Sequence, residues 1–315
     1  MFTSGCFDPS ILIVVASARD LKKVTRLLPF PKARRETLPD PLQRLHPLLK
    51  FVRMPAKIQL ISTDFDGTLV SHASEPVFDH DCMELIRELQ REGALWAINT
   101  GRSVGLLEEG LEDFAFPLLP DFILTSERDV FRPTESGWAP YGDWNARCGQ
   151  AHAELYQSAS AILAEVVDFV SRRTRARVIY EADEPAGVIA SSEEEMDRLT
   201  KFIDEAKASE PKFHYQRNTI YLRFCHADYH KGAALEELSR LTKISHANIF
   251  AVGDHHNDIS MLDGRFAALP ACPANAIPEV KEAVRNAGGY VAKKEYGAGV
   301  HEALLHFAES CPATD

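Results

Sequence analysis

Short apolar runs alternate with segments of helical periodicity from residue 57 onward. Three of the runs are almost continuously apolar, which is typical of strands buried on both faces of a sheet. They are 57–63, 94–99 and 122–125. The two segments between them, 79–92 and 104–111, repeat apolar side chains at helical spacing. This order of strands and helices predicts a parallel sheet covered by helices.

The same alternation returns after residue 229. Two apolar runs predict strands at 249–252 and 266–269. Amphipathic segments predict helices at 230–241 and 277–287. A third helix is predicted to begin at 258–262. Both halves therefore predict one α/β core, a Rossmann-like doubly wound parallel sheet.

About a hundred residues separate the two halves. A connection between a strand and a helix normally takes about 2–6 residues, so this interval must fold by itself. Its patterns predict strands at 129–132, 177–181, 187–190, 213–216 and 219–224, and helices at 147–172 and 192–208. We therefore predict an α+β cap domain at 126–228, inserted into a core formed by 56–125 and 229–315.

Composition adds limits to this picture. The 315 residues are 45% apolar, carry a formal charge of -11 and contain six scattered cysteines without a CxxC pair. The charge argues against a nucleic-acid binder, and no apolar run reaches the length of about 18 residues that spans a membrane. Isolated thiols indicate neither a zinc site nor a disulfide framework, and they suit a reducing, cytoplasmic location.

The charge is unevenly distributed. Residues 1–55 hold ten basic and four acidic side chains, so this segment is +6 and the rest of the chain is -17. The prolines at 29, 31, 39, 41 and 47 interrupt any long helix there. We favour a dispensable basic extension, with the functional protein beginning near Met54, over an organelle-targeting peptide or a helical addition to the domain.

Carboxylates follow two of the predicted strands. Asp64 and Asp66 are two residues apart at the end of 57–63, so their side chains point to the same side of an extended chain. Asp254 and Asp258 follow 249–252 at a spacing of four, which is one face of a helix. Carboxylate oxygens favour Mg²⁺. The adjacent His255 and His256 invite a zinc interpretation, but neighbouring histidines diverge on most backbones, so we interpret them as loop residues.

Two further motifs could bind phosphate. Thr100-Gly101-Arg102 offers a hydroxyl, a backbone N–H and a guanidinium directly after a strand. Lys231 begins a predicted helix, where the helix dipole disfavours a cation unless it faces an anion. Each motif alone could be a helix cap, a turn or an exposed lysine. Together they lie where open parallel sheets form their ligand crevice.

These four motifs, in this order, resemble those of the haloacid dehalogenase superfamily of phosphohydrolases. Asp64–Leu69 matches DxDGT, Gly253–Asp258 matches GDxxND, and Thr100 and Lys231 match the two motifs between them. The resemblance covers about 57–306. Ala274–Ala276 and the late insertion are similar to the Cof-like and sucrose-phosphatase-like branch.

The resemblance implies a Mg²⁺-dependent phosphomonoester hydrolase with an aspartyl-phosphate intermediate on Asp64. Asp66 would act as general acid and base. The expected Mg²⁺ ligands are Asp64, the backbone carbonyl of Asp66, Asp254 and Asp258, the last in the outer shell or through water. The expected phosphate-binding residues are Thr100, Gly101, Lys231, Asn257 and Asn275.

One departure from the family pattern concerns the substrate. Many Cof-like relatives have Asn-Gly after the third strand, whereas this chain has Ser126-Glu127-Arg128. Sucrose-phosphatase-like members also lack that pair, which favours a sugar phosphate among small phosphorylated metabolites. Two alternatives stay open, a phosphotransferase or phosphomutase and a phosphate-ester-binding regulatory protein without turnover. The sequence indicates no oligomeric state.

Overall fold

The computed structural model describes residues 58–181 and 183–309. The predicted basic extension at 1–55 and the start near Met54 lie outside the described residues, and both stay predictions. No helix in the described ranges has the length and apolar character needed to cross a bilayer.

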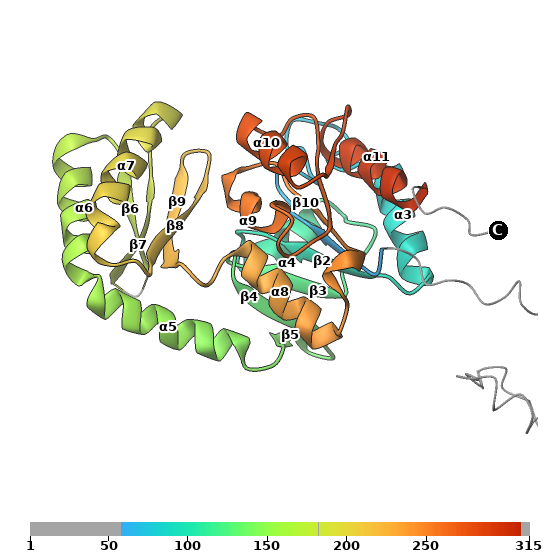
Figure 1. The fold of residues 1–315 in the computed structure, drawn as a ribbon, viewed down its shortest axis with the longest axis horizontal. Helices are drawn as coiled ribbons and strands as arrows, with labels where there is room; N and C mark the ends of the chain where they lie inside the picture. The colour runs from blue at the N-terminus through green and yellow to red at the C-terminus, as the bar shows by residue number, and fades with distance from the viewer. Residues whose placement is uncertain (1–57, 182, 310–315) are drawn as a thin grey trace, which may run out of the picture. The chain divides into compact units, whose positions relative to one another are not determined.

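An eight-stranded sheet forms the core (Figure 1). Its order is β12-β11-β10-β1-β2-β3-β4-β5, and the strands from β12 to β3 are paired in parallel. The direction of winding changes between β1 and β10, which confirms the doubly wound prediction. The parallel strands are β1 (Leu60–Thr63), β2 (Leu95–Asn99), β3 (Phe122–Thr125), β10 (Ile249–Val252), β11 (Leu269–Cys272) and β12 (Tyr290–Val291).

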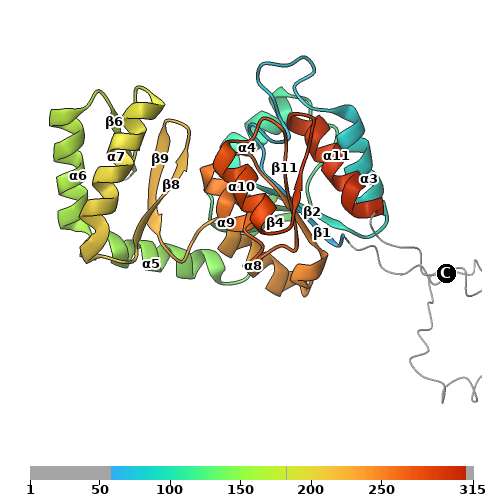
Figure 2. The ribbon, with the colours of Figure 1, turned by 45° about the horizontal axis from the view of Figure 1, so that its top comes forward.

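Helices cover both faces of this sheet because its central strands are buried on both sides. Every residue of β1 and β10 is buried, and burying each large aliphatic side chain stabilises the fold by about 1.5–3 kcal/mol. One face packs on α3 (His80–Arg91), α4 (Val104–Asp113) and α11 (Tyr296–Glu309). The other packs on α8 (Lys231–Thr242), α9 (Ile259–Leu262) and α10 (Pro278–Asn286). Figure 2 shows α3 and α11 side by side.

Two strands within the range predicted for the cap, the second of them not predicted as a strand, instead extend the core. β4 (Asp129–Thr134) pairs antiparallel with β3, and β5 (Gly137–Pro140) pairs with β4. Residues 129–140 therefore belong to the core sheet, contrary to a cap beginning at 126. Hydrophobic alternation identifies a strand but not the sheet that it joins, and the tight turn after Thr125 returns the chain to the same sheet.

The inserted cap is a four-stranded antiparallel sheet of order β6-β7-β9-β8. Its strands are β6 (Arg177–Glu181), β7 (Glu184–Ile189), β8 (Phe213–Asn218) and β9 (Tyr221–His226). The buried side chains of β7, β8 and β9 pack with those of α6 (Ser160–Arg173) and α7 (Glu193–Ala206) in a separate apolar cluster. The α+β character of the insertion agrees with the prediction.

Other predictions of elements need correction. The single helix predicted at 147–172 is two helices, α5 (Trp144–Ser158) and α6, because Ala159 leaves helical geometry at φ -89° and ψ 7°. α5 contacts β4 in the core and β9 in the cap. The strand predicted at 266–269 lies at Leu269–Cys272 instead. The apolar run extends past residue 269, and the strand occupies its later part. No helix or strand was predicted after residue 287, where β12 and α11 lie.

Candidate active site

The predicted motifs meet where the sheet changes its direction of winding. Asp64 follows β1, Asp254 follows β10, and Thr100 follows β2. Lys231 is the first residue of α8, beside them. Open α/β sheets bind ligands at this point because the loops on either side of it diverge and leave a crevice.

Lys231 joins the two halves of the site. It is fully buried, and its Nζ donates to Oδ1 of Asp64 and to Oδ1 of Asp258, each at 2.7 Å. Burial by itself would lower the pKa of Lys231, but the charges of Asp258 and Asp64 outweigh burial and raise this pKa above its usual range. The lysine is thus a permanent cation that faces two protein anions. Its contact with phosphate stays a prediction.

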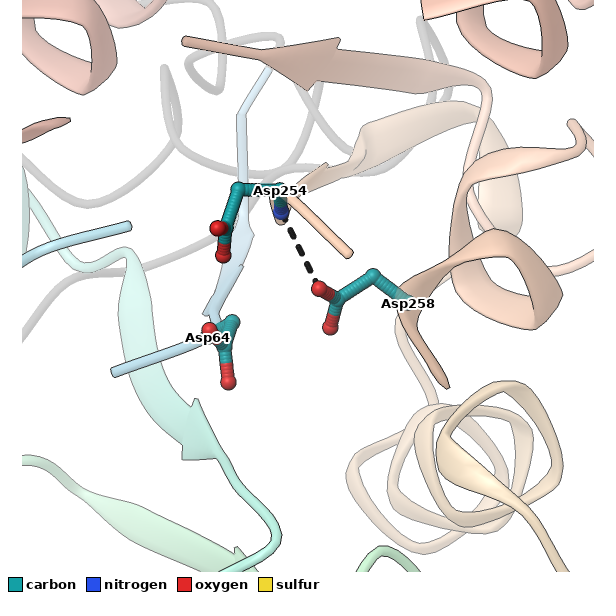
Figure 3. A group of neighbouring side chains, drawn as sticks. All are labelled: Asp64, Asp254 and Asp258. Atoms are coloured by element: carbon teal, nitrogen blue, oxygen red, sulfur yellow. Dashed lines mark hydrogen bonds between the residues drawn. The ribbon is translucent and has the colours of Figure 1, made fainter. Parts of the chain in front are cut away.

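Three aspartates point toward one centre (Figure 3). Asp64, Asp254 and Asp258 each offer an oxygen, and these oxygens lie within 4.8 Å of one another. Burial, followed by the charge of Asp258, raises the pKa of Asp254 to about 7, and burial also raises the pKa of Asp64. Carboxylates this close repel one another unless a cation or a proton lies between them. A set of oxygen donors fits Mg²⁺.

Two glycines allow these carboxylates to approach. A Cβ on Gly67 would lie 2.5 Å from Oδ2 of Asp254, and Gly67 also has φ +84°, which favours glycine. A Cβ on Gly253 would lie 2.4 Å from Cγ of Asp258. The Asp258 carboxylate instead accepts from the backbone N–H groups of Asp254 and His255, at 3.0 and 2.9 Å. The glycines of both motifs therefore serve the geometry of the carboxylates.

The histidines of the motif turn away from this cluster. The nearest nitrogen of the His255 ring lies 3.2 Å from the backbone nitrogen of Thr219, in the turn between β8 and β9 of the cap. Burial lowers the pKa of His255 to about 4. Within the described residues, neither His255 nor His256 belongs to a group of potential metal ligands. The described residues thus offer no group of zinc ligands around these histidines.

Asp66 is held by a basic pair. Arg102 donates to both Asp66 oxygens, at 2.7 and 2.6 Å, and Nε2 of His72 lies 2.7 Å from Oδ1. Burial raises the pKa of Asp66, but the hydrogen bonds from Arg102 and His72 outweigh burial and lower it overall. Arg102, which the sequence offered as a phosphate ligand, thus binds the predicted general acid.

The turn after β2 holds Thr100 and Gly101, and their binding of phosphate stays a prediction. Thr100 is buried, and its Oγ1 accepts from the backbone N–H of Arg102 at 3.2 Å, which leaves the hydroxyl proton free to donate to a ligand. Ser103, and not Thr100, caps helix α4. The structure thus excludes the alternative in which Thr100 serves only as the cap of this helix.

Two asparagines have different partners. Nδ2 of Asn257 donates to Oε1 of Glu127 at 2.8 Å. Asn275 instead donates to the carbonyl of Gly67 and accepts from the N–H of Tyr296, each at 2.8 Å. Asn275 thus links the loop after Asp64 to Tyr296, and its predicted contact with phosphate stays a prediction.

Glu127 is a buried residue of the site that was not predicted from the sequence. Its side chain lies between Asn257 and Gly101. Burial raises the pKa of Glu127, although Lys231 and the hydrogen bond from Asn257 oppose this effect. Its only sequence signal was the departure from Asn-Gly at 126–127.

Comparisons with known proteins agree with the motifs. The family model for haloacid dehalogenase-like hydrolases matches residues 164–304. A protein of Streptococcus pyogenes, named as a candidate phosphatase, is 22% identical over 270 residues, which cover 78% of this chain and 97% of that protein.

Solved structures share the fold. A sucrose-phosphatase from Synechocystis, in complex with sucrose and phosphate, has a TM-score of 0.60 at 20% identity. A sugar phosphatase of haloacid dehalogenase subclass IIB has a TM-score of 0.55 at 18% identity. Each comparison covers 79% of this chain and 98% of the other. These structures confirm the fold, and the match to the family model supports the resemblance inferred from the motifs.

We expect Mg²⁺ to stabilise the protein more at pH 8 than at pH 5.5. Since the pKa of Asp254 is raised to about 7, this carboxyl group is protonated at pH 5.5, and Mg²⁺ must displace the proton in order to bind. Without metal, stability should fall as pH rises from the usual pKa of 3.8 to about 7, because the unfolded aspartate ionises first. Thermal unfolding with and without Mg²⁺ measures both effects. A Mg²⁺ concentration 100-fold above Kd adds about 2.7 kcal/mol to the free energy of unfolding. An equal shift at both pH values, or one kept by Asp254→Asn, would contradict this expectation.

A second prediction separates the two roles of Gly67. Gly67→Ala and Gly93→Ala both place alanine at positive φ, so each should destabilise the fold by about 1–2 kcal/mol in urea unfolding. Nothing lies within 4 Å of a Cβ on Gly93, whereas a Cβ on Gly67 meets Asp254. Only Gly67→Ala should therefore weaken Mg²⁺ binding, measured by calorimetry. Unchanged Mg²⁺ affinity in Gly67→Ala would refute the close-approach argument.

Proposed function

We propose that this haloacid dehalogenase-like hydrolase cleaves phosphate monoesters of small metabolites with Mg²⁺, through an aspartyl-phosphate on Asp64. The observation that carries the proposal is the buried contact of Lys231 with Asp64 and Asp258, next to an intact Asp66. A protein that only binds phosphate esters has no use for a general acid beside such a nucleophile.

The chemistry would proceed in two steps. A carboxylate oxygen of Asp64 attacks phosphorus while the ester P–O bond breaks, and Asp66 gives its proton to the leaving oxygen. Water then attacks the aspartyl-phosphate, Asp66 takes a proton from this water, and the P–O bond to Asp64 breaks. Inorganic phosphate leaves and Asp64 is restored.

The other residues hold charge in place. Lys231 fixes one oxygen of Asp64 and offsets its charge as the phosphoryl group approaches. The Thr100 hydroxyl and the N–H of Gly101 would donate to phosphoryl oxygens. Asp64, Asp254, Asp258 and the Asp66 carbonyl would hold Mg²⁺, which neutralises phosphoryl charge when bound.

A sugar phosphate is the substrate class that we favour. Two structures with this fold are named as a sucrose-phosphatase and a sugar phosphatase. We place the enzyme in the cytoplasm because the four cysteines in the described ranges are free thiols, which suit a reducing compartment. A phosphomutase is the main alternative, since Asp66 could equally activate a sugar hydroxyl.

The primary test is phosphate release from a panel of phosphate esters. We expect Mg²⁺-dependent turnover by the natural chain, and Asp64→Asn should lower kcat by at least about 10⁴-fold because the nucleophile is lost. Asp263→Asn is the matched control, since Asp263 pairs with Arg265 outside the site. Equal turnover by Asp64→Asn would exclude the proposal, and isomerisation of a hexose phosphate without free phosphate would favour the mutase.

Arg102 should set the pH range of the first step. Asp66 must be protonated to act as general acid, and the hydrogen bonds of Arg102 help to lower its pKa. Arg102→Gln should therefore raise this pKa and move the loss of activity at high pH toward higher pH. Single-turnover rates of leaving-group release across pH measure the shift. No shift, or one toward lower pH, would mean that Asp66 is not the acid.

A further inference from the structure

The turn between β3 and β4 has an unfavourable sequence. Ser126 and Glu127 both have positive φ, at 52° and 65°, and the N–H of Arg128 donates to the carbonyl of Thr125 at 3.1 Å. Positive φ at two consecutive positions favours asparagine and glycine, as in the Asn-Gly pair of type I′ turns. Serine and glutamate are strained there. Asn-Gly would relieve this strain, yet the chain has Ser-Glu at these positions. Strained residues often lie at functional sites, which points to a function for the Glu127 side chain.

Glu127 contacts both loops that are expected to bind phosphate. Its backbone N–H donates to the carbonyl of Thr100 at 3.0 Å. Its Oε1 accepts from Nδ2 of Asn257 at 2.8 Å and would lie 3.1 Å from a Cβ on Gly101. The glutamate therefore fills the space between the turn after β2 and the metal loop after β10.

The contact is buried and incompletely satisfied. Glu127 is 7% exposed and Asn257 is 3% exposed. Oε2 of Glu127 and Oδ1 of Asn257 are buried without a hydrogen-bond partner in the described ranges. Unpartnered buried oxygens destabilise a fold, so they are tolerated where a ligand or a mechanism needs them. The charge of Lys231 is close enough to act on Glu127.

We propose that Glu127 is a positioning residue, which holds Asn257 against the Thr100–Gly101 turn so that the two loops receive the phosphoryl group as one unit. This inference rests on the proposed phosphoryl site. It assigns to the turn after β3 a role that no motif residue carries, and it explains why the strained pair at 126–127 is present.

Two substitutions separate positioning from charge. Glu127→Gln keeps an oxygen that can accept from Asn257, so kcat/KM and the affinity for inorganic phosphate with Mg²⁺ should stay within about threefold. Glu127→Ala leaves Asn257 without its acceptor, so both should fall by about tenfold to a hundredfold. Glu135→Ala, an exposed glutamate on the next turn, is the control and should change neither. Kinetics and isothermal calorimetry give the two readouts.

A third variant separates function from stability. Ser126→Asn combined with Glu127→Gly restores the favoured turn and removes the side chain. We expect its melting temperature to equal or exceed that of the natural chain, while its phosphate affinity falls as in Glu127→Ala. A glutamate with only a structural role could not give this combination.

The outcomes distinguish this inference from the proposed function. Full phosphate affinity in Glu127→Ala, or losses in Glu127→Gln as large as in Glu127→Ala, would overturn the positioning role while phosphatase activity stands. If the natural chain binds phosphate with Mg²⁺ but hydrolyses no ester, the proposed function fails. The affinities of the three variants would then still decide the role of Glu127.

Discussion

Lys231 is held between Asp64 and Asp258 by two contacts of 2.7 Å, and the rest of the site depends on this buried group of charges. Charges removed from water lose hydration, and only close, well-formed partners offset that loss. Removing one partner from such a group costs about 3–5 kcal/mol because it leaves an uncompensated charge. The group therefore fixes β1, α8 and the loop after β10 relative to one another.

The same group is unbalanced. One ammonium faces Asp64 and Asp258, and Asp254 lies within reach of the same centre. The remaining negative charge explains the raised pKa of Asp254 and makes a cation the natural complement of the site. Arg102 and Asp66 form a separate ion pair, so the predicted acid has a charge partner of its own, apart from the three clustered carboxylates. Two aspartates only two residues apart therefore lie in different electrostatic environments, since the pKa of Asp64 is raised and that of Asp66 is lowered.

The sequence was sufficient where a local pattern determines the position of a side chain. Apolar strands followed at once by Asp64, Thr100 and Asp254 predicted both the sheet and the edge where these residues meet. It was insufficient where the outcome depends on packing between distant segments. The partners of Arg102 and Asn275 are backbone and carboxylate groups brought close only by the fold. β4 likewise belongs to the core because it pairs with β3, and the alternation of apolar and polar residues does not show which strand is the partner.

Glu127 shows how the core site and the cap are connected. It directly precedes Arg128, whose carbonyl accepts from the indole N–H of Trp144 at 2.7 Å, at the start of the helix that leads to the cap. The return from the cap ends at His230, whose side chain caps α8 just before Lys231. The helix that leaves the core for the cap thus starts against the turn that holds Glu127, and the chain re-enters the core next to Lys231. Since His255 also meets the cap turn at Thr219, three loops of the site lie against the cap or against the segments that lead to it.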